Sequence, residues 1–403
     1  MNAMCGTQGN GSHATQFFFD GPSLRFYDNF SSTDLVTTRK FRDTNAWYHV
    51  VAAIDTSQST SADRVKIYVN GTQETSFATS NYPGQGDGMK LNISGNTFFV
   101  GTAETTGGSK FGYFDGCMSH FHFIDGTAYA PTVFGSTDST TGEWKINTNP
   151  SVTYGNNGFF ILKDAGSVTD QSGNSNNFTV GGGTLTNTED NPSNVFNTLN
   201  LLTKDSSDTL ANGNLKWTAA SGAGYSTVLS TLGFNTGKYY AEAKIVSAST
   251  YYPVIGIASS EASSYYYQPA SRDYIGQSTG SAGLFMHGDI RIDNSAGSPA
   301  PASYTTNDIV GLAVDLDSAT KTLKIYKNGT LDQTYTISAP RGFYHFACSG
   351  GGTTSDSVAW NFGNGFFATT AISSEGTNAS NLGKFEYDVP AGYTALCTKG
   401  LNE

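Results

Sequence analysis

Two stretches of the chain share one pattern of hydrophobic and polar positions. The motif VKIYVNGT occupies residues 65–72, and LKIYKNGT occupies residues 323–330. Apolar residues at every second position predict a strand with one buried face. The Asn-Gly pair that closes each stretch predicts a type I′ turn, because both central residues of that turn need positive φ. Each stretch is therefore predicted to form one strand and the turn of a hairpin.

The residues ahead of both hairpins also match. Each hairpin follows an apolar run that ends in aspartate, VVAAID at 50–55 and VGLAVD at 310–315. Any antiparallel protein contains hairpins, but the shared order of apolar strand, Asp, polar loop and Asn-Gly turn favours two β-domains of common architecture. This pattern directs the search for function to loops at sandwich edges rather than to a buried catalytic centre.

Periodicity and turn signals divide the chain into three segments. Residues 1–135 alternate short apolar runs with Asp-Gly and Asn-Gly turns and show no long helical period, which predicts a β-sandwich. Residues 136–210 are dominated by Gly, Asn, Ser and Thr and are predicted to be a connector with little core of its own, with room for a strand or two. Whether this connector is extended or packed on its neighbours stays open. Residues 211–403 again carry strand patterns, for example at 237–246 and 254–258, and are predicted to be a second sandwich. The predicted fold class is all-β.

Composition narrows the classes of function. Charged residues make up 14% of the 403 residues, below the usual share of about 25%. The formal net charge of −11, with no basic stripe, argues against nucleic acid as a partner and against anionic membranes. No apolar run approaches the roughly 20 residues that span a bilayer, so membrane insertion is not expected. Residues 1–11 lack the apolar segment of a signal peptide, so secretory export is not supported.

Metal and cofactor signals are weak. Cys5, Cys117, Cys348 and Cys397 are far apart, which favours isolated thiols over a metal site, although a disulfide between distant cysteines stays open. The pair His120-x-His122 lacks further ligands. Asp55 and Asp315 end matching strands, but calcium needs six to eight oxygens and no dense acidic loop is present. Turn-forming roles are favoured for both aspartates, and no cofactor is predicted.

Tyrosines supply the main candidate for a ligand-binding site. Tyr251 and Tyr252, and then Tyr265, Tyr266 and Tyr267, flank a polar stretch that leads to Arg272 and Asp273. Exposed tyrosines stack on sugar faces and also suit protein recognition at low entropic cost. The alternative, that these rings are packed strand tyrosines or subunit contacts, is the more common role of aromatic residues.

A second candidate face follows in the chain. His287 and Asp289 alternate with apolar residues in the same register as Arg291 and Asp293, so all four share one face if this stretch is a strand. That face is either a ligand surface or an ordinary solvated sheet face, and the second interpretation is favoured. Three tryptophans, Trp47, Trp217 and Trp360, lie within apolar strand patterns and are predicted to be core anchors.

Catalytic motifs are absent from the sequence. The motif Glu-x-Asp-x-x-Glu of some sandwich glycosidases does not occur, and retaining glycosidases need two close carboxylates. Gly-x-Ser-x-Gly and phosphate-binding loops are also missing. The protein is therefore predicted not to be an enzyme, and no catalytic residue is assigned.

Several motifs resemble those of a known group of proteins. The motifs WYHVV, DTSQ, RVKIYVNG, FDG and HFIDG, between residues 47 and 126, resemble the laminin G or concanavalin A-like sandwich of tailed-phage structural proteins. The motifs YGNNGF at 154–159 and DQSGN at 170–174 resemble the connector in the same proteins. GKYYAE at 237–242, IGIA at 255–258 and WNFG at 360–363 are similar to a SPRY domain, which is also a concanavalin A-like jelly roll. The ending PAGYTALCT fits the phage version.

The resemblance implies a virion component that is assembled in the host cytoplasm. It implies a tail fibre or related appendage that attaches to the host surface by binding a glycan or a protein; a capsid or tail decoration protein and a polysaccharide depolymerase are the alternatives. Its implied partners are other virion proteins and copies of itself, as a homotrimer. Sandwiches of the first kind carry strands before the position of Phe17, and the chain is expected to lack them, so that the sandwich is trimmed or completed by a neighbouring subunit.

Overall fold

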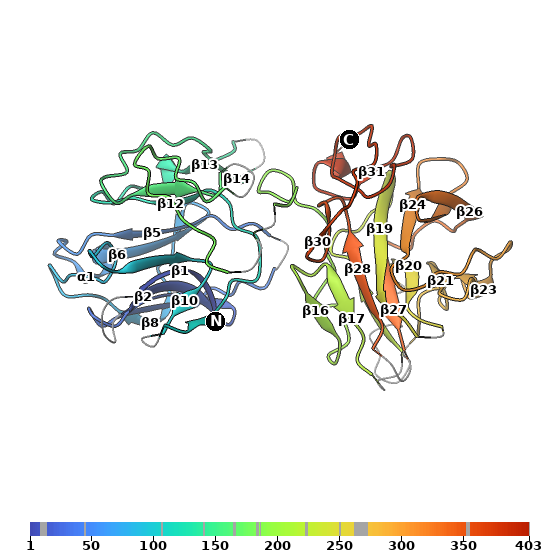
Figure 1. The fold of residues 1–403 in the computed structure, drawn as a ribbon, viewed down its shortest axis with the longest axis horizontal. Helices are drawn as coiled ribbons and strands as arrows, with labels where there is room; N and C mark the ends of the chain where they lie inside the picture. Colours follow the sequence, from blue (N-terminus) through green and yellow to red (C-terminus); the bar gives the residue numbers. More distant parts are fainter. Residues whose placement is uncertain are drawn as a thin grey trace. The chain divides into compact units, whose positions relative to one another are not determined.

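The computed structural model shows two compact units, Met1–Asn187 and Thr188–Glu403 (Figure 1). The residues that it describes are 1–8, 14–43, 46–105, 108–139, 142–163, 167–182, 185, 187–221, 225–249, 251–261, 273–351 and 355–402. The boundary between the units falls inside the segment that was predicted to be a connector. Short strands dominate both units, so the all-β fold class is confirmed.

Two sheets form the sandwich of the N-terminal unit. The larger has the strand order β8-β4-β3-β2-β1-β9, formed by Phe77–Asn81, Thr33–Thr37, Ser23–Asp28, Ala14–Asp20, Asn2–Gln8 and Thr97–Val100. The smaller is β5-β6-β7, formed by Val50–Ile54, Val65–Val69 and Thr72–Gln73, with the single helical turn α1 (Ser61–Arg64) between β5 and β6. Leu24, Phe26 and Leu35 of the large sheet share one buried core with Val65 and Ile67 of the small sheet, which defines a sandwich.

A strand ahead of Phe17 corrects one expectation. Residues 2–8 form β1, which pairs with both β2 and β9 and so lies inside the sheet. Its sequence, NAMCGTQ, is polar and contains glycine, which hid the strand from pattern analysis. Strand packing is close at Gly6, where a Cβ would lie 3.2 Å from the carbonyl oxygen of Thr15.

The first half of the predicted connector packs on the segment that precedes it, an outcome that the sequence left open. Strand β12 (Phe121–Phe123) pairs with β15 (Phe159–Ile161), and β13 (Gly135–Thr137) pairs with β14 (Trp144–Ile146). The Phe159 ring lies at the centre of a cluster and contacts the rings of Phe98, Phe121, Phe123 and Phe178. The short apolar island at 158–162 is thus one half of a two-stranded ribbon.

The C-terminal unit is a second sandwich. One sheet has the order β16-β17-β28-β19-β24-β25-β26, formed by Thr209–Ala211, Lys216–Thr218, Ser357–Asn361, Lys238–Ser247, Ile309–Asp315, Thr322–Lys327 and Thr330–Thr336. The other has the order β18-β27-β20-β21-β22-β23, formed by Ser226–Leu229, Tyr344–Gly350, Val254–Ser259, Ser281–Phe285, Ile290–Ile292 and Ser295–Ala296. A short strand, β31 (Thr394–Ala395), adds in parallel to the start of β19.

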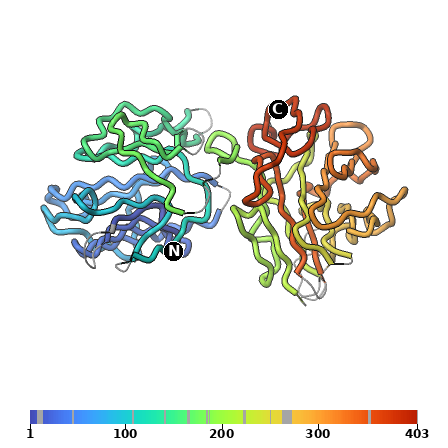
Figure 2. Tube along the Cα trace, viewed as in Figure 1, coloured from blue at the N-terminus to red at the C-terminus, as the bar shows by residue number. Residues whose placement is uncertain are grey.

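The buried core between these two sheets contains Trp217 and Trp360, as predicted. Trp47 is different: it is only partly buried and precedes β5 instead of lying in it. The outer face of the first sheet is also covered. The C-terminal segment packs Phe385, Val389 and Tyr393 on Tyr240 of β19, and the red trace in Figure 2 runs beside that strand. Strand β24 is therefore buried at every residue, on both of its faces.

The two hairpins match in detail. Asn70 and Gly71 have φ of 47° and 75°, and Asn328 and Gly329 have φ of 48° and 80°, so both Asn-Gly turns have the predicted conformation. In each turn the asparagine Oδ1 accepts a 2.8 Å hydrogen bond from a backbone N–H of the neighbouring strand region. The donor to Asn70 is His49, just ahead of β5, and the donor to Asn328 is Ile309, the first residue of β24. The repeated sequence motif thus forms the same hairpin turn in both units.

An aromatic ring covers each turn and makes glycine necessary. A Cβ on Gly71 would lie 2.1 Å from the Trp144 ring, and a Cβ on Gly329 would lie 2.5 Å from the Tyr387 ring. Gly71→Ala is expected to destabilise the N-terminal unit by about 3 kcal/mol, from backbone strain plus the clash. Gly21→Ala is the matched control, since Gly21 has φ of 56° and nothing within 4 Å. It should cost only about 1 kcal/mol. Calorimetry of both variants measures the difference, and equal losses would contradict the role of Trp144.

Two smaller expectations concern cysteines and the membrane. The structure describes all four cysteines, and no disulfide joins any two of them. Among the described residues, no helix has the length and apolar character that a membrane crossing requires.

Candidate ligand-binding site

A row of aromatic rings lies at one end of the sheet that contains β18, β27 and β20. The centroids of neighbouring rings are 5.0–6.2 Å apart, and the rings belong to Tyr225, Tyr252, Tyr274, Phe285, His287 and Tyr251. Tyr252 and Tyr274 each contact both Tyr225 and Phe285, and His287 joins Phe285 to Tyr251. We call these six residues the aromatic row. The Phe285 ring is buried, whereas Tyr225 and Tyr251 are exposed. The row therefore runs from the protein interior to the surface at both ends.

Strand ends place these rings side by side. Tyr225 directly precedes β18, whose first residue pairs with Gly350, the last residue of β27. Tyr252 precedes β20, whose first residue, Val254, pairs with Phe285 at the end of β21. Because neighbouring antiparallel strands start and finish at the same edge, residues that are far apart in the chain meet here.

The most exposed part of the row joins Tyr251, His287 and Asp289. The Tyr251 side chain is 56% exposed, and its ring stands at 88° to the His287 ring at a centroid distance of 5.2 Å. His287 Nε2 lies 3.0 Å from Asp289 Oδ2, so the two side chains share a hydrogen bond. The hydrogen-bonded His287–Asp289 pair therefore lies beside the exposed Tyr251 ring.

The backbone around these three residues is closely tied. The Met286 N–H donates to the Tyr251 carbonyl, and the Tyr304 N–H donates to the Met286 carbonyl. Gly288, between the histidine and the aspartate, has φ of 97°, and a Cβ there would lie 2.7 Å from the Pro301 carbonyl oxygen. Only glycine fits this turn, and the side chains on either side of it are therefore held in fixed positions.

The Tyr252 ring lies inside the row, and its phenol has a raised pKa. Burial raises the pKa of the Tyr252 phenol, and its hydrogen bond with Tyr225 raises that pKa further. Tyr252 therefore stays neutral at physiological pH and serves as packing for the row. In the described structure, no lysine or arginine forms an ion pair with Asp289 or lies over a ring of the row.

The structure places some residues of the predicted site together and separates others. It brings Tyr251, Tyr252, His287 and Asp289 into one region. Tyr265, Tyr266, Tyr267 and Arg272 lie outside the described residues. Asp273 is half-buried, and its backbone carbonyl accepts a hydrogen bond from Thr227.

The single strand expected for His287, Asp289, Arg291 and Asp293 does not exist. His287 and Asp289 lie in the turn before β22, and only Arg291 is in that strand. Asp293, with φ of 52°, lies in the next turn, where its carboxylate accepts bonds from Gly280 and Ser338. The Gly288 and Asn294 positions carried the turn signal, but the alternation of charged residues hid it.

Three members of the row were missed in the sequence. Tyr225, Tyr274 and Phe285 stand alone in their segments, without a second aromatic residue beside them. Tyr274 alone had a local signal of a binding site, because it directly follows the predicted Arg272-Asp273 pair. Their shared location depends on strand pairing, and no spacing along the chain encodes it.

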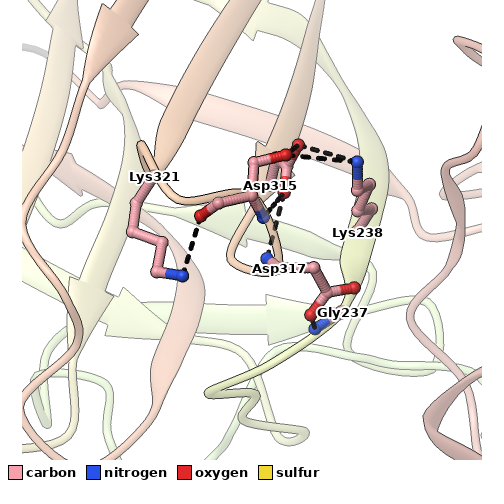
Figure 3. Close-up of polar contacts among 6 residues, drawn as sticks. Gly237, Lys238, Asp315, Asp317 and Lys321 are labelled. Carbon is pink, nitrogen blue, oxygen red and sulfur yellow. Dashed lines mark hydrogen bonds and ion pairs between the residues drawn. The ribbon is translucent and has the colours of Figure 1, made fainter.

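The aspartates at the ends of matching strands serve in turns, as predicted. Asp315 accepts hydrogen bonds from the backbone N–H groups of Asp317 and Ser318, and its Oδ2 lies 2.9 Å from Lys238 Nζ (Figure 3). These donors lower the pKa of Asp315 to about 2. Asp55 accepts bonds from Ser57 and Gln58 in the same way. Each carboxylate is thus already surrounded by protein donors.

Among the described residues, the histidine pair at 120 and 122 has no third metal-ligating side chain beside it. His122 Nδ1 bonds the Tyr154 hydroxyl at 2.9 Å, and its ring stacks on Phe160 with centroids 3.9 Å apart. Burial lowers the pKa of His122 to about 3, so it stays neutral at physiological pH. No cluster of three or more metal-ligating side chains occurs within the described part of the chain.

Parts of the chain are similar to known proteins. Residues 2–134 match the family model described as "Concanavalin A-like lectin/glucanases superfamily" (Laminin_G_3). Among solved structures, the chain is similar to the SPRY domain of human HERC1, with 16% identity, a TM-score of 0.33 and coverage of 40% of this chain and 96% of that one. A human SPRY domain is similar at 13% identity, with a TM-score of 0.31 and coverage of 39% and 95%. No curated protein sequence matches the chain.

Proposed function

We propose that this protein is a non-enzymatic attachment component of a tailed-phage particle. In this proposal the aromatic row of the C-terminal unit contacts a glycan or protein on the host surface. The N-terminal sandwich joins the chain to other virion proteins and to copies of itself, as a homotrimer. The motifs shared with phage structural proteins support the virion assignment, and the match of residues 2–134 to a lectin-like family model is consistent with it.

One observation carries the proposal: an exposed tyrosine ring stands beside a hydrogen-bonded His–Asp pair. A flat ring that is 56% exposed offers apolar contact area with little side-chain entropy to lose. The adjacent carboxylate is 70% exposed and offers directed hydrogen bonds. Rigid aromatic anchors next to polar groups are characteristic of recognition surfaces.

Adsorption to host cells tests the proposal. The fluorescently labelled full chain is expected to bind the host envelope, and the double variant Tyr251→Ala/His287→Ala should bind at least about tenfold more weakly, because it removes the accessible ring and its support. Tyr113→Ala is the control, since Tyr113 is 66% exposed but lies in the other unit. If the unmodified chain does not bind cells and associates only with virion proteins, the protein is a decoration component and the adhesive role is wrong.

A further inference from the structure

We propose that the aromatic row binds an uncharged pyranose glycan, with the sugar face on Tyr251 and sugar hydroxyls on Asp289. This inference rests on the attachment function and specifies the chemical class of the ligand. Tyr251, His287 and Asp289 carry it, each by a different contact.

Tyr251 supplies the stacking surface. Its ring is held upright by the perpendicular His287 ring, 5.2 Å away, and His287 in turn rests on the buried Phe285 ring at 5.6 Å. The exposed Tyr251 ring is thus supported by two further rings that pack on each other. An apolar ring face of this size matches the C–H face of a pyranose, and its phenol hydroxyl adds a hydrogen-bonding group at the rim.

Asp289 supplies directed hydrogen bonds. His287 Nε2 occupies Oδ2 at 3.0 Å, and within the described structure no hydrogen bond reaches Oδ1. A carboxylate that is held through one oxygen can accept sugar hydroxyls through the other, and hydrogen bonds to a charged acceptor are stronger than neutral ones. The rigid turn at Gly288 sets the position of this acceptor relative to the ring.

Charge excludes the acidic glycans. Asp289 is the exposed charged group of this surface, and no described lysine or arginine pairs with it. The whole chain carries a formal net charge of −11. An anionic sugar would meet the like charge of Asp289, with which no lysine or arginine of the described residues pairs. This repulsion costs binding free energy and slows association. A neutral glycan meets no such barrier.

A glycan array with the full chain tests the inference. The array carries uncharged hexose and N-acetylhexosamine oligosaccharides beside sialylated, uronic-acid and phosphorylated ones. We expect binding to uncharged members only, with affinity that changes less than about twofold between roughly 50 and 500 mM salt. Binding only to acidic members, or affinity that falls steeply with salt, would overturn the inference.

Single substitutions then assign the contacts on an uncharged oligosaccharide selected from the array. Tyr251→Ala should weaken binding at least about tenfold, whereas Tyr251→Phe, which keeps the ring, should stay within about threefold. Asp289→Asn should weaken binding about tenfold, because the charged acceptor is lost. Unchanged binding in Tyr251→Ala and Asp289→Asn would place the glycan elsewhere and overturn the inference.

The outcomes separate this inference from the attachment function. If the chain binds no glycan but still adsorbs to cells through the aromatic row, and protease treatment of the cells abolishes adsorption, the ligand is a protein. The attachment function then stands and the glycan assignment is wrong. If the chain binds neither the array nor cells, both are wrong.

Discussion

Replacing Glu242 with alanine is expected to destabilise the C-terminal unit by about 4 kcal/mol near pH 5, because several buried donors lose their acceptor at once. Glu242 is fully buried in the middle of β19. Its carboxylate accepts hydrogen bonds from the backbone N–H groups of Glu386 and Tyr387, each at 2.9 Å, and from Asn361 and the Tyr240 hydroxyl, each at 3.2 Å. One side chain therefore holds the C-terminal segment on the sheet.

The same carboxylate gives the unit a pH dependence of predictable sign. Burial raises the pKa of Glu242 from its ordinary value of 4.5 to about 7 and outweighs the donors, which lower it. The folded state thus binds the proton more tightly than the unfolded state does. The stability that this proton contributes is fully present below pH 4.5 and is lost as the pH rises through about 7.

Chemical denaturation between about pH 5 and pH 8 measures both effects. The free energy of unfolding of the unsubstituted protein should fall across this window by up to about 3 kcal/mol through this group, and Glu242→Ala should remove that part of the slope. Glu375→Ala is the control, since Glu375 is exposed in the same segment. An equal pH slope in Glu242→Ala and the unsubstituted protein would show that the carboxylate does not titrate there.

Asp28→Ala is expected to cost the N-terminal unit about 4 kcal/mol for a similar reason. Asp28 is fully buried. It accepts bonds from the backbone N–H groups of Phe30, Ser31 and Lys90 at 2.7–3.1 Å, and from the Thr15 and Ser31 hydroxyls. It thereby joins the β2–β3 pair, the turn that follows and a loop that is distant in the chain.

A graded series tests the role of Asp28. Asp28→Asn keeps one oxygen but points an amide N–H at a buried donor, so it should cost about half as much as Asp28→Ala. Asp115→Ala, at an exposed position, should change the midpoint of thermal unfolding by less than about 2 °C. If Asp28→Ala unfolds at the midpoint of the unsubstituted protein, water replaces the carboxylate and the proposed role is wrong.

The successes of sequence analysis share a local cause. The paired hairpins, their Asn-Gly turns and the turn roles of Asp55 and Asp315 depend on side-chain alternation and on backbone preferences within a few residues. The burial of Trp217 and Trp360 follows from the same alternation. These features are encoded where they occur, so a pattern of neighbouring residues was sufficient to predict them.

The features that the sequence did not predict share a cause as well. The polar strand β1 is a strand because β2 and β9 flank it, and the ribbon of β12 and β15 exists because Phe159 finds four rings from other segments. His287 and Asp289 looked like strand residues, but the chain turns between them at Gly288, which has φ of 97°. The lack of room for a Cβ there, beside the Pro301 carbonyl, comes from a segment outside the local pattern.

The sequence by itself therefore determined that the chain forms β-sandwiches with tight turns, because strand periodicity and positive-φ turns are properties of short segments. Only the tertiary structure decided which tyrosine rings contact one another and which carboxylates are buried. It also decided that residues 2–8 form the strand β1 between β2 and β9. Those outcomes depend on pairing between residues far apart in the chain. Tyr225 joins Tyr252 and Tyr274 because β18, β20 and β27 end at one edge, and no spacing along the chain records that edge.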